Sequence, residues 1–504
     1  MRVVFPEEMR EIDRITVERG VPSLILMEHA ARSLFEEIVR TDVLKITILC
    51  GAGNNGGDGY ALARLLKFCG FDPEVVAIYA PKTKDCKKNV QLFKNSGGSI
   101  YRFQKLSKSK LNSIINESEL IVDAIFGTGF RGELPGEISE LIKNINNLKK
   151  AVLAVDTPSG INCENGEVCP LTFDCHKTIT FGALKFGQLL FPARNFLGEI
   201  IVADTGFPKK VIFENSSINL IHRMMIKNIL PPRKADSYKG TYGKVLIIGG
   251  SKEYSGAPLL SAMGALRTGA GIVYTYTPLR VQEVIRNKYP EIIASSGEDS
   301  DLLIEQDIFQ IEKLVREMDV IVLGPGIGRT KNTINLVFKI IELIKKQKKF
   351  LVIDADGLYA VSHDINIVMN SDRIVLTPHP GEFKRLIGDE NLNLKNNPKY
   401  IIEQIKKLKT NVLFKDTISI FTDFSGESWI NIHGNTSLSK GGSGDLLSGS
   451  IAGFFAQSKD IVKSTILGTY FLGRSAELLD ISEAFALPED VCRGYDRVFN
   501  DLLK

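Results

Sequence analysis

The stretch KITILCGAGNNGGDGYALARLLKF, residues 45–68, decides the fold class of the first half of the chain. Its first six residues form a short apolar run that is typical of a buried strand, and its last nine have the spacing of an amphipathic helix. Between them, the loop 51–59 contains five glycines, two asparagines and an aspartate, so its backbone can approach a ligand closely. A strand, a glycine loop and a helix in this order predict one unit of a parallel α/β sheet.

Apolar runs repeat this alternation along the chain. In the first half they lie at residues 75–80, 120–127, 151–160, 177–181 and 199–206, with helical segments between them. After a stretch without a clear period near residues 212–232, a second series begins at residue 244 and continues to residue 423. We therefore expect two three-layer α/β domains, at residues 1–212 and 225–504, whose polar and glycine-rich turns lie at the carboxyl ends of the strands, where open sheets bind ligands.

Composition argues against several classes of protein. A chain of 504 residues needs more than one core, and 63 basic against 59 acidic residues leave a net charge of +4, which disfavours a general nucleic-acid binder. The seven cysteines form no C-x-x-C pair, no apolar run approaches membrane-spanning length, and the start, MRVVFPEEMREIDR, lacks the regions of a signal peptide. We therefore expect a cytoplasmic protein that binds neither nucleic acid nor membrane.

Polar residues follow the predicted strands of the first half. Asp123 and Ser159 each follow a strand, and together with Asn55 of the glycine loop they could supply hard oxygen ligands to a cation. Asp156 could hold a ribose or an amide group. Taken alone, Asp123 and Asp156 are more often carboxylates that cap loops, and a glycine loop is as often only a turn.

The stretch NTSLSKGGSGDLLSGSIAG, residues 435–453, has the composition of an anion site in the second half. Gly441, Gly442 and Gly444 allow backbone N–H groups to converge on an oxygen-rich group. Asp445 opens the helix that follows, whose positive end favours phosphate, and it could take a proton from an attacking hydroxyl. For a lone G-x-G-D, a turn and a helix cap are the commoner explanation.

Four segments ahead of this stretch favour the functional interpretation. GPGIG (324–328) and DADGL (354–358) follow strands, TPHPGE (377–382) presents His379 between prolines, and Lys415 follows another strand. Each has an ordinary explanation, since His379 would be a loop residue and Lys415 a solvated charge. In one α/β domain, however, they predict a site for a nucleotide and a hydroxyl-bearing substrate.

The motifs GAGNNGGDG, VDAIFGTGFRGELPG and VDTPSG resemble those of the YjeF N-terminal domain, the NAD(P)H-hydrate epimerase, over about residues 1–210. The resemblance implies a Rossmann-like domain that binds hydrated nicotinamide nucleotide, with a potassium ion (K⁺) around Asn55, Asp123 and Ser159. Asp123 is also our candidate for the acid or base that inverts the hydroxyl-bearing carbon. The implied pocket residues are Asn54, Asn55, Gly56, Gly57, Asp58, Gly127, Thr128, Gly129, Phe130, Arg131, Gly132, Glu133 and Asp156.

The motifs KGTYGKVLIIGGS, GPGIG, DADGL, TPHPGE and NTSLSKGGSGDLLSG are similar to the YjeF C-terminal domain, the ADP-dependent NAD(P)H-hydrate dehydratase of the ribokinase-like superfamily, over about residues 225–500. The resemblance implies ADP as the phosphoryl donor, and the nucleotide in turn implies Mg²⁺; Asp445 would be the catalytic base. The hydrated substrate would contact Ala257, Gly326, His379 and Asp445, and the adenine nucleotide Lys415, Asp416, Thr417, Ile418, Ser419 and Gly444. Asp416 departs from the family, which usually has a glycine there, and brings a negative charge towards the phosphates.

Together the two resemblances imply a bifunctional repair enzyme. It would interconvert the R and S forms of hydrated NADH or NADPH and dehydrate the S form at the expense of ADP, giving NAD(P)H, AMP and phosphate. The expected partners are these small molecules, and we expect a homo-oligomer. Two alternatives stay open: the second domain could be a kinase for a small vitamin alcohol, and the first could be a non-catalytic nucleotide-binding or scaffold module.

Overall fold

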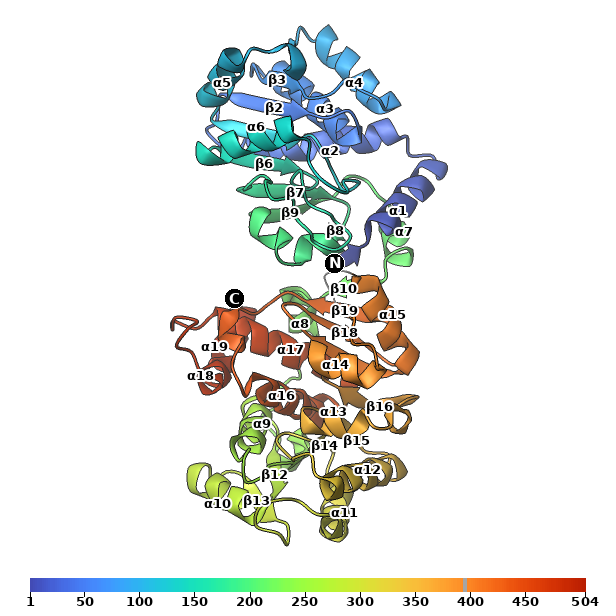
Figure 1. Ribbon diagram of the computed structural model, residues 1–504, viewed down its shortest axis with the longest axis vertical. Coiled ribbons are helices and arrows are strands. Elements are labelled where there is room, and N and C mark those ends of the chain that lie inside the picture. The colour runs from blue at the N-terminus through green and yellow to red at the C-terminus, as the bar shows by residue number, and fades with distance from the viewer. Residues whose placement is uncertain (393–396) are drawn as a thin grey trace. The chain divides into compact units, whose positions relative to one another are not determined.

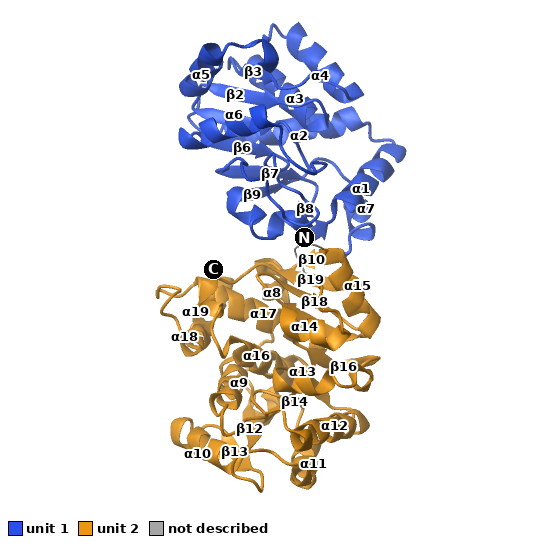
Figure 2. Ribbon diagram, viewed as in Figure 1, with its two compact units in different colours: residues 1–218 blue, residues 219–504 orange. Residues whose placement is uncertain are grey.

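The computed structural model describes residues 1–392 and 397–504, which divide into two compact units, residues 1–218 and 219–504 (Figure 2). Each unit is built around a sheet that is mainly parallel, with helices packed on it (Figure 1). The predicted fold class of two α/β domains is therefore confirmed. Among the described residues, no helix combines the length and the apolar character that a membrane crossing needs.

The sheet of the first unit is parallel throughout and runs in the order β4-β3-β2-β5-β6-β7-β9. The chain leaves β2 towards one edge of the sheet and then returns to β5, on the other side of β2. The loops that follow β2 and β5 therefore diverge and leave a crevice at their carboxyl ends. The strands are β2 (Ile46–Cys50), β3 (Glu74–Ala77), β4 (Ile100–Arg102), β5 (Leu120–Ala124), β6 (Ala151–Val155), β7 (Lys177–Phe181) and β9 (Glu199–Ala203), and a separate parallel pair joins β1 (Arg2–Val4) to β8 (Leu184–Lys185).

Helices cover both faces of this sheet because alternate side chains of each strand point to opposite faces. In β2, Ile48 belongs to a core formed with α2, α3 and α4, whereas its neighbour Leu49 belongs to a core formed with α5 and α6. The helices are α1 (Pro6–Glu18), α2 (Ser23–Ile38), α3 (Asn54–Phe68), α4 (Lys84–Asn95), α5 (Lys108–Glu117), α6 (Gly136–Asn147) and α7 (Lys209–Glu214). The first unit is thus a three-layer α/β domain.

The strands of the second unit follow the order β13-β12-β11-β14-β15-β16-β17-β18-β19. Pairing is parallel as far as β17 and antiparallel from β17 to β19. The strands are β11 (Lys244–Ile248), β12 (Ile272–Thr277), β13 (Ile293–Ser296), β14 (Val320–Leu323), β15 (Phe350–Ile353), β16 (Ser371–Leu376), β17 (Thr410–Lys415), β18 (Ser419–Thr422) and β19 (Ser428–Asn431), and β10 (Ile218–Leu220) lies at the junction of the two units in the sequence.

One face of this sheet packs on a helix that is buried nearly all round, α16. Its apolar residues share a core with α9, α17 and strands β11 and β14. A Cβ placed on Gly449 of α16 would lie 1.7 Å from the Ser261 carbonyl oxygen of α9, so only glycine allows this close approach. The helices are α8 (Arg223–Ile229), α9 (Gly256–Arg267), α10 (Leu279–Lys288), α11 (Ile308–Glu317), α12 (Lys331–Lys346), α13 (Asp356–Val361), α14 (Pro380–Ile387), α15 (Pro398–Leu408), α16 (Ser443–Ser458), α17 (Ile461–Glu477), α18 (Pro488–Arg493) and α19 (Tyr495–Leu503).

Two local features differ from the sequence-based expectation. The apolar run from residue 412 to residue 423 is a hairpin, in which β17 and β18 are joined by a turn at Asp416–Ile418. This turn contains neither glycine nor proline, the usual signals of a turn. The stretch 212–232, in which we find no period, contains β10 and α8, which are too short to show one.

Candidate active sites

A cavity of about 900 Å³ opens in the first unit at the carboxyl ends of β2 and β5. Ten of the predicted substrate residues line it: Asn54, Asn55, Asp58, Gly127, Thr128, Gly129, Phe130, Arg131, Glu133 and Asp156. Gly56, Gly57 and Gly132 do not line it. A Cβ placed on Gly56 would lie 2.1 Å from the Gly51 carbonyl oxygen, so Gly56 serves to tighten the loop around the start of α3.

Asp156 lies on the cavity wall next to a buried lysine to which no sequence motif pointed. Lys185 is 1% exposed, and its Nζ donates to Asp156 Oδ1, to Thr180 Oγ1 at 2.7 Å and to the Phe181 carbonyl oxygen at 3.0 Å. Thr128 donates to the other carboxylate oxygen of Asp156. Burial acts to raise the pKa of Asp156, but the Lys185 ammonium and these hydrogen bonds outweigh it and lower the pKa. Asp156 is therefore held as a carboxylate.

Asp58 is a second carboxyl group on the cavity wall, and its environment is the opposite one. It is 8% exposed, it is the fifth residue of α3 and it has no ion pair with the described residues. Burial, followed by the charge of Asp156, raises its pKa well above the ordinary value. These two carboxyl groups of the cavity wall therefore differ, because Asp156 pairs with a lysine whereas burial disfavours ionisation of Asp58.

Asp123 lies behind the cavity wall, where it is fully buried and paired with Ser159. Its Oδ1 accepts from Ser159 Oγ at 2.7 Å and its Oδ2 accepts from the Ser159 backbone N–H at 2.7 Å. Burial raises the pKa of Asp123 to about 6. It makes no ion pair with any residue that the structure describes, so a carboxylate here lacks a compensating cation.

Asn55 brings an unused amide atom to the same loops. Its Nδ2 is buried and has no hydrogen-bond partner in the described part of the chain, and its Oδ1 lies 2.9 Å from the place of a Cβ on Gly127. Rotating the amide by half a turn would put its oxygen at the unpaired position. Hard cations prefer oxygen ligands such as a carboxylate, a hydroxyl or an amide oxygen. The set Asn55, Asp123 and Ser159 offers one of each, and its buried carboxylate has no counter-ion, so it fits the K⁺ implied by the resemblance.

In the second unit, the glycines at the start of α16 differ in their roles. Gly442 is the N-cap residue and takes the left-handed conformation, with φ +98°. Gly444 is helical, and its value lies in the missing side chain, because a Cβ there would lie 3.2 Å from Lys415 Nζ and 3.6 Å from Asp354 Oδ2. The ammonium of β17 and the carboxylate that follows β15 thus lie directly against the first turn of α16.

Asp445, the third residue of α16, does not cap the helix. The N-cap is Gly442 and has no side-chain hydrogen bond, and the Asp445 carboxylate makes no hydrogen bond or ion pair with any described residue. Burial and the negative charge of Asp354 raise the pKa of Asp445 to about 7, with Lys415 acting in the opposite direction. A half-buried, unpaired carboxyl group with this pKa is suited to accept a proton near neutral pH.

Lys415 connects the acidic groups of this site. Its Nζ donates to Asp354 Oδ1 at 2.8 Å, and Asp354 is 2% exposed. Burial acts to lower the pKa of Lys415, but the charges of Asp354, Glu382 and Asp445 together raise it. The lysine therefore stays charged and faces three carboxyl groups.

His379 and Glu382 hold each other at the start of α14. His379 Nδ1 accepts from the backbone N–H groups of Gly381 at 3.1 Å and Glu382 at 3.3 Å, and Glu382 Oε2 accepts from the His379 backbone N–H at 2.9 Å. Because Nδ1 accepts, the ring proton is on Nε2. His379, which is exposed, can therefore donate a hydrogen bond to a ligand.

Ala257 and Gly326 are also brought together, next to Tyr254, which lines a smaller cavity. A Cβ on Gly326, where φ is +63°, would lie 3.2 Å from Ala257 Cβ. The neighbouring cavity of about 440 Å³ is lined by residues 251–254, 301–302, 328–330 and by Asp356. Asp356 is neutralised there, since its carboxylate accepts from Arg329 Nε at 2.7 Å and from the Gly328 backbone N–H at 3.1 Å.

The residues expected to hold the adenine nucleotide form the turn between β17 and β18. Asp416 and Thr417 are exposed, and Ile418 is buried beneath them. The Asp416 carboxylate accepts from the Thr417 backbone N–H at 2.7 Å. The side chain that departs from the family pattern is therefore folded against its own turn.

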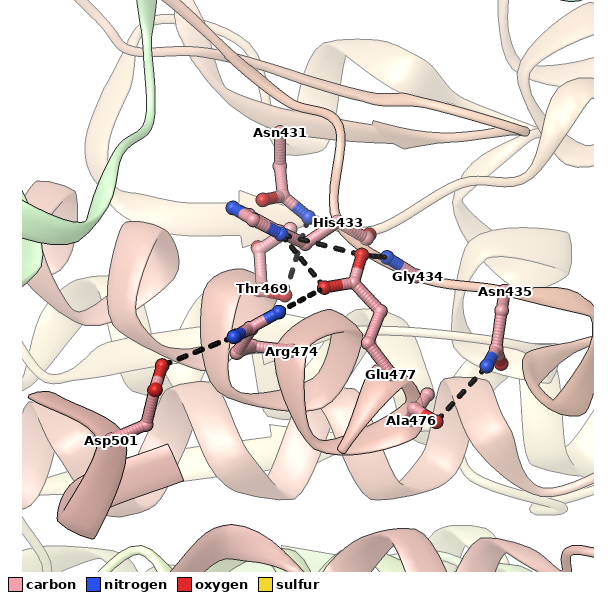
Figure 3. A network of polar contacts seen from close by, with 9 residues as sticks. All are labelled: Asn431, His433, Gly434, Asn435, Thr469, Arg474, Ala476, Glu477 and Asp501. Atoms are coloured by element: carbon pink, nitrogen blue, oxygen red, sulfur yellow. Dashed lines mark hydrogen bonds and ion pairs between the residues drawn. The ribbon is translucent and has the colours of Figure 1, made fainter. Parts of the chain in front are cut away.

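A polar network fixes the residues that lead into the glycine stretch (Figure 3). His433 Nδ1 lies 3.0 Å from Glu477 Oε2, and Arg474 joins Glu477 to Asp501. Asn435 Nδ2 donates to the Ala476 carbonyl oxygen at 3.0 Å. Helices α17 and α19 thereby anchor the strand end from which the stretch 435–445 begins.

Sequence reasoning missed several residues of both sites. Asp354, Asp356 and Glu382 lie inside the motifs DADGL and TPHPGE. Their position in these motifs could have identified them as site residues. Lys185 lies outside all of these motifs, and it matters because the fold buries it.

Comparison with known proteins identifies relatives of both units. Residues 245–493 match the family model described as NAD(P)H-hydrate dehydratase, and residues 23–187 match the model described as YjeF-related protein N-terminus. The bifunctional NAD(P)H-hydrate repair enzyme Nnr of Dictyoglomus turgidum is 35% identical over 491 residues, covering 94% of this chain and 93% of its own length. The protein of the same name from Moorella thermoacetica is 32% identical, covering 95% and 92%.

Among solved structures, the second unit resembles a ribokinase-like superfamily protein from Enterococcus faecalis V583. The sequence identity is 24% and the TM-score is 0.50, with 57% of this chain and 96% of that chain covered. At this identity, the likeness concerns the fold alone, and it agrees with the predicted ribokinase-like architecture.

Proposed function

The chain belongs to the family of bifunctional NAD(P)H-hydrate repair enzymes, and from this premise we propose how its two units divide the repair of hydrated NADH and NADPH. Residues 1–212 would carry the epimerase and residues 225–504 the dehydratase. The epimerase converts the R form into the S form, and the dehydratase returns the S form to the reduced nucleotide. The free state of all seven cysteines supports a cytoplasmic site of action.

Epimerisation takes place in the large cavity of the first unit. Inversion requires the hydroxyl beside the ring nitrogen to leave as water and to be added again from the other face. Asp58, whose pKa is raised by burial, would donate the proton to the leaving hydroxyl, and Asp156, whose carboxylate pairs with Lys185, would orient the ribose or the amide. The other predicted substrate residues of the cavity wall surround the rest of the nucleotide.

Asn55, Asp123 and Ser159 would hold K⁺ behind this cavity. Bound there, the ion would supply the positive charge that the buried carboxylate lacks, and would fix the loop after β5 against the loop after β2. Asp123 is also our sequence-based candidate for the acid or base. Because its carboxylate does not line the cavity, the contacts favour the ligand role over direct proton transfer.

Dehydration takes place at the start of α16. Asp445 would take the proton of the substrate hydroxyl while the hydroxyl oxygen attacks the terminal phosphorus of ADP, so that AMP leaves and the hydroxyl becomes a phosphate ester. His379, Ala257 and Gly326 would contact the hydrated ring. Phosphate is a far better leaving group than hydroxide, and its departure opens the way back to the reduced ring.

Lys415 and the backbone N–H groups at the start of α16 would bind the phosphates, with the turn 415–419 and Gly444 beside the adenine nucleotide. Glu382 and Asp445 lie beside the single ammonium, which Asp354 already pairs. This excess of negative charge suits a nucleotide that arrives with Mg²⁺ bound to its phosphates, because the ion would reduce repulsion between phosphate and carboxylate.

The observation that carries this proposal is the unpaired Asp445 carboxyl group at the start of α16, beside Lys415. Incubation of hydrated NADH with ADP or ATP tests it. Recovery of the absorbance of reduced nicotinamide, with release of AMP when ADP is the donor, is the expected result. Phosphorylation of a vitamin alcohol without such recovery would favour the kinase alternative.

A further inference from the structure

Dehydration needs a second base, because two hydrogens leave the substrate. Hydration of a reduced nicotinamide adds a hydroxyl to C6 and a hydrogen to C5, so the reverse reaction must break a C5–H bond as well as the C6–O bond. In the proposed function, on which this inference rests, Asp445 takes the hydroxyl proton and is then protonated. Another group must accept the proton from C5.

Two carboxylates of the site are held by cations. Asp354 Oδ1 accepts from Lys415 Nζ at 2.8 Å. Asp356 uses both of its oxygens, one for Arg329 Nε at 2.7 Å and the other for the Gly328 backbone N–H at 3.1 Å. Each of these two carboxylates is therefore already engaged by a cationic side chain.

Glu382 forms no ion pair with a lysine or arginine of the described residues, and one of its oxygens accepts no hydrogen bond. Its side chain is 12% exposed, and its Oε2 accepts from the His379 backbone N–H at 2.9 Å. Within the described residues, the contact of its Oε1 is with His379 Nε2, at 3.5 Å, which is longer than a hydrogen bond. Burial raises the pKa of Glu382, so this group holds a proton more readily than an ordinary glutamate.

His379 cannot take this role in the observed arrangement. Its Nδ1 already accepts two backbone N–H groups, and its Nε2 carries the ring proton. The ring is therefore a donor, which can orient the nearby Glu382 carboxylate and contact the substrate.

Glu382 and Asp445 both lie near Lys415. The charges of both act on Lys415, whose Nζ lies 3.2 Å from the place of a Cβ on Gly444, the residue before Asp445. A hydrate bound with its hydroxyl at Asp445 and its phosphoryl group at Lys415 would bring its ring towards Glu382, the other carboxyl group near this lysine.

We propose that Glu382 is the base that removes the C5 proton from the phosphorylated hydrate. As the C6–O bond breaks, its electron pair leaves with phosphate, and the nitrogen lone pair forms an iminium bond to C6. Glu382 Oε1 then takes the C5 proton. The C5–H electron pair forms the C5=C6 double bond, and the iminium pair returns to nitrogen, so that the products are reduced nicotinamide, phosphate and AMP.

The variant Glu382→Gln separates the two halves of the reaction. Its amide oxygen can still accept from the His379 backbone N–H, but the side chain takes up no proton. Once phosphate has left, the iminium ion can then add water and return to the hydrate. We expect AMP to form while formation of NADH falls at least about a hundredfold, so that the ratio of AMP to NADH rises far above the one-to-one ratio of the wild type.

The controls distinguish this inference from the proposed function. A wild-type protein that forms no NADH with ADP would refute the proposed function itself. If the wild type is active, a Glu382→Gln variant with one AMP per NADH, or one that loses both products equally, would refute the role of Glu382 alone. Glu403→Gln, on the exposed side of α15, should keep the wild-type ratio.

An isotope measurement on the wild type covers the case in which Glu382→Gln does not fold. With hydrated NADH that carries deuterium at C5, a base fixed on one side of the ring must remove the hydrogen from a single face. Loss of deuterium from one face supports a fixed base, and loss from both faces contradicts it.

Discussion

The two units each place a buried or half-buried lysine among carboxyl groups at the ends of their strands, but the two lysines pair differently. Lys185 donates directly to Asp156 on the wall of the first cavity and lowers its pKa. Lys415 donates to Asp354 instead and leaves Asp445 without a partner, with a pKa of about 7. The same residue types thus produce an ion-paired carboxylate in one unit and an unpaired carboxyl group in the other.

This difference shows that the role of an aspartate here is decided by the pairing of its neighbouring lysine. Asp445 lies in the first turn of α16, whereas Asp156 lies in the loop that follows β6. A direct ion pair with a lysine makes an aspartate a weaker base. Where the lysine pairs with a different carboxylate nearby, it still supplies positive charge for phosphate and leaves the aspartate basic.

Asp445→Asn should break the second site most severely. It removes the proposed base, so dehydration should fall at least about a hundredfold, while epimerisation in the first unit continues. Because the folded-state pKa lies above the unfolded one, the Asp445 charge costs stability once pH exceeds about 4, and fully so above about 7. At pH 8 the free energy of unfolding of the variant should therefore be at least as large as that of the wild type. Parallel assays of NADH formation and epimer exchange check this, and an unchanged dehydration rate would refute the role of Asp445.

Lys185→Met tests the direct pairing of the first unit. It leaves Asp156 as an uncompensated carboxylate, and removal of one partner of a buried ion pair costs about 3–5 kcal/mol in the free energy of unfolding. Denaturant titration measures this loss. Lys177→Met, which breaks more exposed ion pairs with Glu37 and Glu199, is the matched control and should cost about 1 kcal/mol or less. Equal losses in the two variants would contradict the account of Lys185.

The pH dependence of the two activities should differ in the same sense. Dehydration requires ionised Asp445, so kcat/KM should rise about tenfold per pH unit below about 7 and level off above it. Epimerisation should not rise with pH in this way, because its proposed acid, Asp58, acts in the protonated form and has a raised pKa, while Asp156 stays paired with Lys185. Initial rates measured between pH 5.5 and 8.5 test both expectations, and a dehydration rate that does not vary there would contradict them.

Glu477→Gln should produce the smallest effect, since it loosens the support of the glycine stretch without touching the reacting groups (Figure 3). Burial acts to raise the pKa of Glu477, but hydrogen bonds from His433, Gly434 and Arg474 lower it to about 2. Loss of the charge should cost about 1 kcal/mol in stability and reduce dehydration only severalfold. Glu312→Gln, in an exposed pair on α11, should change neither quantity.

The sequence predicts the layers of the fold because each strand is a short apolar run that ends in a glycine or polar turn. It misses the turn at Asp416–Ile418, where no glycine or proline marks the reversal, and the short elements β10 and α8. The glycine motifs locate both sites because glycine allows close backbone approach at Gly56 and leaves room for the Lys415 side chain at Gly444.

The charge relations within the sites could not be predicted from the sequence. Lys185 becomes important only because the fold buries it against Asp156, which lies 29 positions earlier. Lys415 and Asp354 are 61 positions apart, and nothing in the sequence shows which of the nearby acids the lysine will pair with. Such pairing is a property of the assembled sheet.

The most direct test of the central claim is the recovery of reduced-nicotinamide absorbance from an equal mixture of the two epimers of hydrated NADH in the presence of ADP. The account predicts full recovery with the wild type, because the first unit supplies the S form to the second, and no recovery with Asp445→Asn. Recovery that stops at half with the wild type would contradict the epimerase, and recovery with Asp445→Asn would contradict the proposed dehydration mechanism.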